Sequence, residues 1–209
     1  MFYIIGLGNP GGEYEATRHN TGRLVLANFI KENLKNGLEP NKKLMALTGE
    51  GKVKKEEFMI IEPETFMNKS GASLKTLVGK IVKKKKIVVN GKKKDALWAE
   101  NLIVLHDDID LPLGKMKMTF NRGSGGHKGV ESIMRTLKTE AFVRIKVGIC
   151  PTTPSGKPKK PDNKKLLDFI VGRFSPKEME IVKKNSKKVT ETLNTLLAEG
   201  VSNAMNGFN

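Results

Sequence analysis

The sequence lacks the features of secreted and membrane proteins. Its single cysteine, Cys150, cannot form an internal disulfide, which favours a reducing compartment. No run approaches the ~18 apolar residues that a membrane span needs. The short apolar stretch at the N-terminus has no basic segment before it, so no signal peptide is predicted. We therefore expect a cytoplasmic protein with no membrane partner.

Several familiar catalytic patterns are also missing. The sequence has no Gly-x-Ser-x-Gly nucleophile elbow and no His-x-x-x-His or comparable metal-ligand spacing. Gly6, Gly8 and Gly11 spell Gly-x-Gly-x-x-Gly after an apolar run, but Pro10 and Gly12 delay the helix whose N–H groups would face a pyrophosphate. We predict no dinucleotide cofactor. A metal site is the less favoured alternative, because histidines and aspartates are present in sufficient number.

Positive charge, in contrast, is abundant. The 209 residues include 38 lysines and arginines against 22 acidic residues, a net charge of +16. Such an excess favours a polyanionic partner, although organism-wide lysine usage is an alternative explanation. Seven lysines lie in the lysine-rich segment 83–98, around an Asn90-Gly91 pair that suits a small hairpin. Solvated charge on a surface loop is the simpler interpretation of this segment, and contact with a phosphate backbone is the alternative.

Predicted strands alternate with predicted helices along the chain. The strands are expected at Phe2–Leu7, at two places within 44–61 around Gly49–Gly51, at Leu102–Leu105 and at Val143–Ile149. The helices are expected at about Thr21–Leu34, around 74–81, around 130–137, and from a capping box at Ser175 to about Gly200. This alternation predicts a single α/β domain, a twisted mixed sheet with helices on both faces. The proline- and lysine-rich segment 151–165 is expected to be a surface loop.

All three histidines occur in polar or glycine-rich segments. His19 follows the first strand, where α/β folds place ligands, and His106 ends a strand just before Asp107. His127 lies in a glycine-rich turn that opens a helix and exposes N–H groups suited to an anion. A histidine combined with a carboxylate and amide side chains suits general-base activation of water. The residues alone leave this as one candidate site among others.

Four segments together resemble the bacterial-type peptidyl-tRNA hydrolase family, and they occur in the family's order. They are Gly6-Leu7-Gly8-Asn9-Pro10-Gly11 with Tyr14 and Thr17-Arg18-His19-Asn20-x-Gly22; Pro63-x-Thr65-Phe66-Met67-Asn68-x-Ser70-Gly71; His106-Asp107-Asp108-Ile109-Asp110-Leu111-Pro112; and Gly125-Gly126-His127-x-Gly129. The resemblance runs from residue 1 to about 205. It implies one α/β domain, usually monomeric, that hydrolyses the ester between a peptide and the 3′ ribose of tRNA. No metal, cofactor or obligate protein partner is implied.

The resemblance also implies roles for individual residues. His19 would be the general base, and Asp107 the carboxylate that holds it. Asn68 would position water and substrate, and Asn9 would read the peptide portion. The remaining substrate- or tRNA-binding residues that it implies are Tyr14, Phe66, His127, Lys128, Lys117, Arg144 and Lys146, with Lys115 and Arg122 added to the basic set.

The sequence departs from the family's pattern in two places. Lys128 stands where the family normally has an asparagine, and lysine donates hydrogen bonds but cannot accept one from water. The lysine-rich segment 83–98 is longer than the family's usual link. These departures motivate an alternative function, an RNA-binding protein of the same fold with little or no catalysis. Esterase action on a small ester is a third possibility, which leaves the positive charge unexplained.

Overall fold

The computed structural model describes residues 1–89, 92–153, 155 and 157–208. The strands are β1 Phe2–Gly6, β2 Glu39–Asn41, β3 Ala46–Val53, β4 Glu56–Pro63, β5 Lys83–Val89, β6 Lys92–Pro112, β7 Met116–Phe120 and β8 Phe142–Cys150. The α-helices are α1 Thr21–Asn33, α2 Val78–Ile81, α3 Lys128–Leu137, α4 Leu166–Val171, α5 Pro176–Glu199 and α6 Val201–Phe208. Three segments are 3-10 helices, η1 Arg18–Asn20, η2 Met67–Leu77 and η3 Asn163–Lys165.

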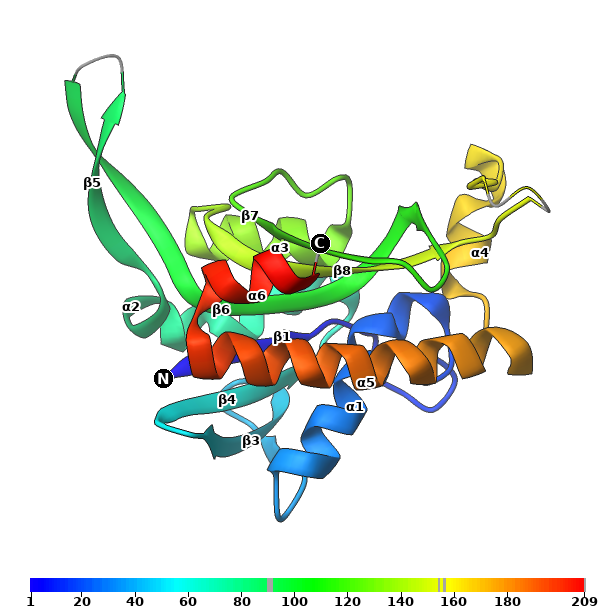
Figure 1. The fold of residues 1–209 in the computed structure, drawn as a ribbon, viewed down its shortest axis with the longest axis horizontal. Helices are drawn as coiled ribbons and strands as arrows, with labels where there is room; N and C mark the ends of the chain where they lie inside the picture. Colours follow the sequence, from blue (N-terminus) through cyan, green and yellow to red (C-terminus); the bar gives the residue numbers. More distant parts are fainter. Residues whose placement is uncertain (90–91, 154, 156, 209) are drawn as a thin grey trace.

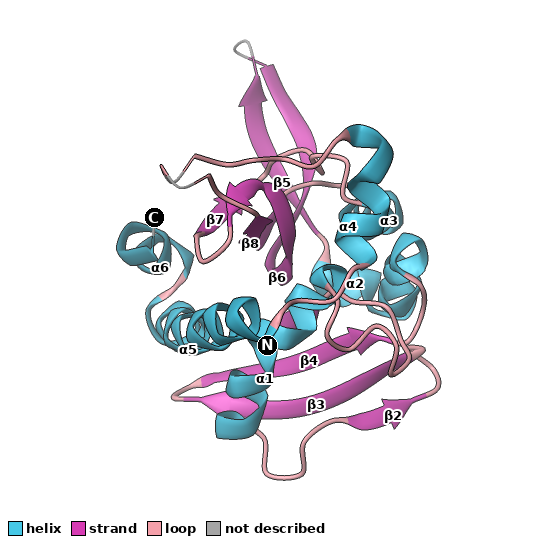
Figure 2. Cartoon of the chain, turned by 90° about the vertical axis from the view of Figure 1, so that its right-hand side faces the viewer, coloured by secondary structure: helices cyan, strands magenta, loops and turns pink. Residues whose placement is uncertain are grey.

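Four parallel strands form the centre of the sheet, in the order β4-β1-β6-β8. Antiparallel strands extend it, with β3 and β2 beyond β4 at one edge and β7 beyond β8 at the other (Figures 1 and 2). Strand β5 pairs with the first part of β6 alone. The expected mixed sheet is therefore confirmed.

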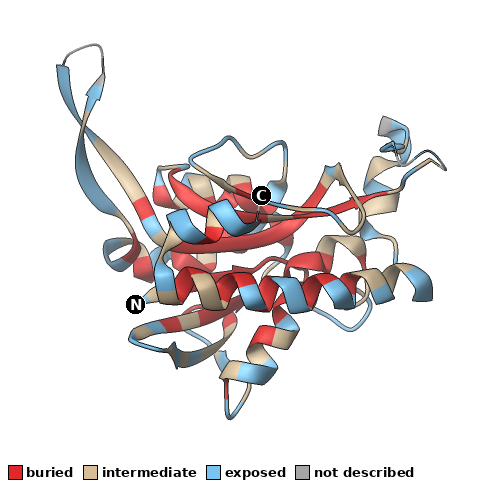
Figure 3. Ribbon diagram, viewed as in Figure 1, coloured by how far each residue is buried: buried red, intermediate tan, exposed pale blue. Residues whose placement is uncertain are grey.

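Helices cover both faces of this sheet. On one face α1 and α5 bury an apolar layer that includes Leu26, Phe29 and Leu193 (Figure 3). On the other face η2 and α3 bury a second layer that includes Leu74 and Ile133. Because central strands are covered on both sides, they read as continuous apolar runs rather than alternating ones. No helix in the described part of the chain has the length and apolar character needed to cross a membrane.

The long C-terminal helix begins where its sequence predicts. The Glu178 N–H donates to the Ser175 hydroxyl at 3.4 Å, and the Ser175 N–H donates to the Glu178 carboxylate at 2.7 Å. This reciprocal pair is a capping box, and Pro176 occupies the first helical turn. The helix ends at Glu199, before Gly200 at φ 91°. The predicted helix at 21–34 is likewise confirmed as α1.

The expected turn at Gly49–Gly51 is wrong, because β3 runs straight through it and the turn falls at 54–55. The glycines serve close packing instead. A Cβ on Gly49 would lie 2.5 Å from a Leu34 methyl group, and one on Gly51 would lie 2.5 Å from the Phe58 ring. Glycine within a strand often marks such an approach rather than a turn. Of the helix expected around 74–81, residues 74–77 are the end of the 3-10 helix η2 and residues 78–81 are the short α-helix α2.

The described residues of segment 83–98 form a two-stranded antiparallel ribbon rather than an irregular surface loop, in agreement with the small hairpin that the sequence suggested there. Its second strand continues without interruption into the centre of the sheet, which makes β6 21 residues long. The predicted Asn90-Gly91 turn lies outside the described residues. In segment 151–165 the described residues show only an isolated bridge between Thr152 and Pro158 and the short η3, as expected for a loop.

Candidate active site

The candidate site lies where the carboxyl ends of β1 and β6 meet the start of α1. Gly22, in the first turn of α1, makes this arrangement possible. A Cβ there would lie 2.3 Å from the Leu105 carbonyl oxygen and 2.5 Å from the Leu7 nitrogen. Only glycine allows the helix to start so close to two strands. The preceding 3-10 turn therefore holds His19 over the end of β6.

His19 and Asp107 form a direct pair. The Nδ1 atom of His19 lies 3.0 Å from Oδ1 and 3.1 Å from Oδ2 of the buried Asp107 carboxyl group. Burial alone would raise the pKa of Asp107, but the two neighbouring imidazoles, His19 and His127, hold it well below its usual range. An ionised carboxylate only accepts hydrogen bonds, so His19 carries its proton on Nδ1. Its Nε2 atom keeps the lone pair that a general base needs.

His127 holds Asp107 from the other side. It is the N-cap of α3, where its Nδ1 accepts hydrogen bonds from the Gly129 and Val130 N–H groups at 3.2 and 3.3 Å. These donors assign the ring proton to Nε2, which donates to Oδ1 of Asp107 at 2.9 Å. Both ring nitrogens are thus bound within the protein. The expected role of His127 in binding substrate or tRNA therefore cannot use a ring nitrogen unless one of these bonds breaks.

His106 contacts the Asp107 backbone and the His127 ring but makes no hydrogen bond with the Asp107 carboxylate. Its Nδ1 lies 2.7 Å from the Asp107 carbonyl oxygen, and its ring contacts His127 with centroids 4.7 Å apart. Complete burial lowers the pKa of His106 well below its usual value, and His127 lowers it further. His106 is therefore a neutral ring whose Nδ1 donates to the Asp107 carbonyl oxygen, and this bond stabilises the backbone at Asp107. His19 and His106 each keep one ring nitrogen without a hydrogen-bond partner among the described residues, but that of His106 is buried, whereas the His19 side chain is partly exposed at a cavity.

His19 and Asp107 line a cavity of about 380 Å³. Lys128 and Lys146 lie at its rim, and Lys146 forms an ion pair with Asp108. One wall is apolar and comes from α4, where Leu167 is 71% exposed beside the cavity. Sequence reasoning missed this wall, although the apolar letters of 166–171 after a proline- and lysine-rich loop were a signal for it.

Arg18 ties the His19 turn to the C-terminal helices. Its guanidinium donates to both carboxylate oxygens of Glu178, at 2.9 and 3.1 Å, and to the Arg173 carbonyl oxygen at 3.0 Å. The same group stacks over the Phe169 ring at 4.3 Å. A two-pronged pair with a stacked face holds a guanidinium in one orientation. Arg18 is therefore a positioning residue for its neighbour His19.

Replacing Arg18 by alanine is expected to lower the free energy of unfolding by about 2–3 kcal/mol, since charged hydrogen bonds and a stacked cation are lost together. Urea denaturation would measure it. Arg18→Lys keeps the charge but not the fork, and we expect it to restore only part of the loss. An alanine variant as stable as the parent would contradict the anchoring role.

The predicted amide and aromatic residues are Asn9, Tyr14, Phe66 and Asn68, and the structure places them in different surroundings. The side-chain oxygen of the buried Asn9 accepts a hydrogen bond from the Met67 N–H at 2.8 Å, which joins the first motif to the second. Tyr14 and Phe66 form an edge-to-face pair with centroids 6.4 Å apart, and Phe66 is 58% exposed. Asn68 is exposed and borders a separate hollow beside α3. The structure thus does not bring Asn68 into the His19 cavity.

Asn20 is a residue that sequence reasoning missed. Its side chain accepts from the Asn9 N–H at 2.8 Å and donates to the Asn9 carbonyl oxygen at 2.9 Å. This pair of bonds replaces backbone partners that the loop after β1 lacks, and so fixes the loop. The buried Asn20 stands beside His19 in the sequence, but nothing in its spacing indicated this partner.

Among the predicted basic residues, Lys117 and Arg122 are exposed and Arg144 is buried. Lys117 is exposed and lies opposite Lys146 in the β7–β8 register, and Arg122 is exposed nearby in sequence. Arg144 is only 2% exposed and donates to the Arg122 carbonyl oxygen at 2.8 Å. Its predicted contact with tRNA is not supported, because the guanidinium is buried and bound to the loop that follows β7.

His19, Asp107 and His127 are the described residues whose ligand atoms converge closely enough for a metal ion, all within 4.8 Å of one another. The hydrogen bonds argue against such use. The His127 nitrogen in this cluster is the protonated one, since its other nitrogen accepts two backbone N–H groups. A protonated nitrogen has no lone pair for a metal. This donor set fits a hydrogen-bonded acid–base site better than a metal site.

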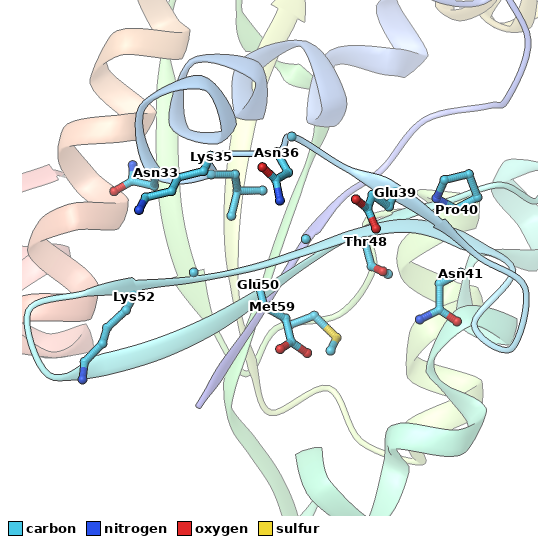
Figure 4. Close-up of a pocket in the computed structure, with 14 residues that line it drawn as sticks. Asn33, Lys35, Asn36, Glu39, Pro40, Asn41, Thr48, Glu50, Lys52 and Met59 are labelled. Carbon is cyan, nitrogen blue, oxygen red and sulfur yellow. The ribbon is translucent and has the colours of Figure 1, made fainter.

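A second hollow, of about 710 Å³, lies between the end of α1 and strands β2 and β3 (Figure 4). The side chains drawn around it are mainly amides, carboxylates and lysines, among them Asn33, Glu39 and Lys52. None of the predicted site residues lines it. The predicted chemistry is thus gathered at the His19 cavity.

The fold and the site together define an α/β protein with a carboxylate-oriented imidazole suited to hydrolysis by activated water. The family model described as "Peptidyl-tRNA hydrolase" matches residues 3–209. The chain is 36% identical over 211 residues to a peptidyl-tRNA hydrolase from Dehalococcoides mccartyi, covering 100% of both chains. It is 37% identical over 210 residues to one from Caldanaerobacter subterraneus, again covering 100% of both. This chain belongs to the peptidyl-tRNA hydrolase family.

The fold agrees with this assignment. The crystal structure of a peptidyl-tRNA hydrolase from Acinetobacter baumannii superimposes with a TM-score of 0.79 at 24% sequence identity, over 100% of this chain and 94% of that one. The resemblance predicted from four sequence motifs is therefore confirmed for the family and for the fold.

Proposed function

We propose that this protein hydrolyses the ester between a peptide and the 3′ ribose of tRNA, with His19 as the general base. The observation that carries the proposal is the 3.0 Å contact between Nδ1 of His19 and the buried Asp107 carboxylate. It leaves the second imidazole nitrogen available at a cavity. Membership of the peptidyl-tRNA hydrolase family supports the choice of substrate.

In the proposed reaction, Nε2 of His19 takes a proton from water while the water oxygen attacks the ester carbonyl carbon. The carbon–oxygen bond to the ribose then breaks, and the imidazolium returns the proton to the departing 3′ oxygen. Asp107 stabilises the imidazolium between these steps and keeps the ring in the correct tautomer. His127 and His106 act through Asp107 and the backbone and need no contact with substrate.

The surroundings of the pair suit a large, two-part substrate. The apolar wall from α4 offers a surface for peptide side chains, and the Tyr14–Phe66 pair offers a stacking surface for the terminal adenosine. Lys117 and Lys146 are placed to meet phosphates near the cavity, which suits an enzyme that accepts many tRNA sequences. We further propose that the protein acts as a cytoplasmic monomer.

The direct test is release of labelled peptide from purified peptidyl-tRNA. We expect hydrolysis at the same rate with and without a strong chelator such as EDTA, because the proposed step uses an imidazole and no metal. Free aminoacyl-tRNA serves as the comparison substrate and should be cleaved more slowly. Intact peptidyl-tRNA after prolonged incubation would remove the proposal, and a chelator-dependent rate would remove the metal-free mechanism.

Lys128 provides the test against the alternative function, RNA binding without catalysis. Its side chain is 70% exposed at the edge of the cavity, and its Nζ lies 3.6 Å from the Glu131 carboxylate. We expect Lys128→Asn to change kcat by less than about 10-fold, since an exposed charge in such a pair is largely screened. A parent protein without activity that gains it in the asparagine variant would instead favour the alternative.

A further inference from the structure

The lysine-rich arm is the feature that the proposed reaction leaves unexplained. We define it as Lys83–Val89 of β5 and Lys92–Trp98 of β6, which pair from Lys83 opposite Trp98 to Val89 opposite Lys92. The arm projects from the body of the protein, and its lysines are all exposed (Figures 1 and 3). An isolated two-stranded ribbon is only marginally stable in water. Internal packing therefore gives no reason for the arm to be so long.

The charge of the arm is concentrated and largely unpaired. Residues opposite one another in an antiparallel ribbon share a face. One face carries Lys83, Lys85, Lys92 and Lys94, and the other carries Lys84, Lys86 and Lys93 with Asp95. Within the described residues, an ion pair is recorded for only one arm lysine, Lys85, whose Nζ lies 2.5 Å from Glu100. Like charges on one narrow ribbon repel, and a polyanion would relieve that repulsion.

The arm is connected to the active-site cavity along one edge of the sheet. At the base of the arm, the Trp98 ring packs against Phe120 at the far end of β7, with centroids 5.2 Å apart. At the near end of β7, Lys117 lies opposite Lys146, which lines the cavity. The 14 residues from Lys94 to Asp107 span up to about 40 Å of extended chain. A single ligand that contacts both the lysine-rich arm and the cavity must be long, and the lysines at both places favour a ligand that is anionic.

We propose that the lysine-rich arm binds the phosphate backbone of the double-helical part of the tRNA whose 3′ end occupies the His19 cavity. This inference rests on the proposed function. RNA duplexes are recognised by shape and phosphate contacts rather than by base sequence, which suits point charges on lysines. A small ester cannot span the distance, and a peptide long enough to do so has no regular array of negative charges for the lysines to bind. Lysines on an edge strand also prevent strand-to-strand association, and the experiment separates that role from RNA binding.

The experiment compares two substrates that carry the same N-blocked aminoacyl ester. One is full-length tRNA, and the other is a trinucleotide that ends in the same 3′ adenosine and cannot reach the arm. The test variant is Lys84→Glu, Lys86→Glu and Lys93→Glu together, and the control replaces the same three lysines by arginine. Both variants keep charged side chains along the strand edge, and circular dichroism and melting temperature check that they fold.

We expect the glutamate variant to raise KM for the full-length substrate by about 10- to 100-fold with kcat unchanged, and to leave the trinucleotide reaction unaltered. The arginine control should match the parent on both substrates. The slope of log affinity against log salt for full-length tRNA should become shallower by about 2–3, at ~0.9 per lost phosphate contact.

Three results would overturn the inference: an unchanged KM for full-length substrate in the glutamate variant, an equal effect on the trinucleotide, or an equal loss in the arginine control. Filter-retention binding of tRNA without an attached aminoacyl group tests the arm separately from catalysis, in the parent and in both variants. A parent that cleaves neither substrate but still binds tRNA through the arm would refute the proposed function alone. If the glutamate variant instead lost the parent's binding to anionic phospholipid vesicles and kept its binding to tRNA, the arm would be assigned to a membrane surface and the RNA contact would be refuted.

Discussion

Replacing His19 by alanine is expected to lower kcat for peptidyl-tRNA by about 10²- to 10⁴-fold, the range that a general base contributes. The imidazole nitrogen that takes the proton from water is lost, while the lysines and aromatic side chains proposed to bind tRNA remain. The affinity for tRNA should therefore stay close to that of the parent. Single-turnover kinetics and tRNA binding measured in parallel separate the two effects.

The matched control is Glu15→Ala, because Glu15 is exposed on the same loop and has no place in the proposed reaction. It should leave kcat unchanged. Loss of activity in both variants would indicate a disturbed loop rather than a missing base. Near-parental turnover in the His19 variant would remove His19 from the mechanism and leave the family assignment intact.

Replacing Asp107 by asparagine is expected to lower kcat by about 10³- to 10⁴-fold, although the shape of the side chain hardly changes. The protonated Nε2 of His127 donates to Oδ1 at position 107. An asparagine there would keep its oxygen toward His127 and turn its NH₂ group toward Nδ1 of His19. His19 would then accept at Nδ1 and carry its proton on Nε2, the nitrogen that must be basic. A wrong tautomer of this kind has a cost of similar size in serine proteases.

The same substitution should move the pH profile in a defined direction. Burial lowers the pKa of His19, but the charge and hydrogen bonds of Asp107 outweigh it, and the net result is a pKa above the usual 6.5. In the parent, kcat/KM should therefore fall as the pH drops through that raised value, because the base becomes protonated. Without the carboxylate only burial remains, so the acid limb of the residual activity should shift to lower pH.

Asp162→Asn is the control for this experiment, since it makes the same chemical change at an exposed position that does not line the His19 cavity. We expect its kcat and its acid limb to match those of the parent. An Asp107→Asn variant whose acid limb stays in place would show that Asp107 does not set the pKa of the catalytic group.

The sequence allowed the family and the main chemistry to be predicted because the relevant signals are local. The capping box at Ser175 and the apolar run at Leu102–Leu105 each act within a few residues, so their structures could be predicted without the rest of the chain. The four motifs carried the identities of His19 and Asp107 in the same way. Without the family resemblance, the residues alone did not show how the three histidines differ, because their hydrogen-bond partners come from other segments of the chain.

The residues that were misjudged are those whose neighbours come from distant parts of the chain. Arg144 was expected to contact tRNA because it is basic, but its position in β8 buries it beneath the 121–127 loop that follows β7. Gly49 and Gly51 looked like a turn because their close contacts appear only once the chain has folded: Gly49 lies against Leu34 at the end of α1, and Gly51 lies opposite Phe58 in the β3–β4 pair. The lysine-rich segment looked like a loop because its repeated lysines do not alternate as a half-buried strand does.

The sequence by itself determined the fold class and the family, because these depend on alternating elements and on short motifs, and the resemblance to that family implied the pair of base and carboxylate. The tertiary structure alone decided the tautomers of His19 and His127, the separation of Asn68 from the cavity, and the reach of the lysine-rich arm. A tautomer depends on which donors surround a ring, and those donors come from a 3-10 turn, a strand and a helix start that lie far apart in the chain. Only folding brings them within hydrogen-bond distance.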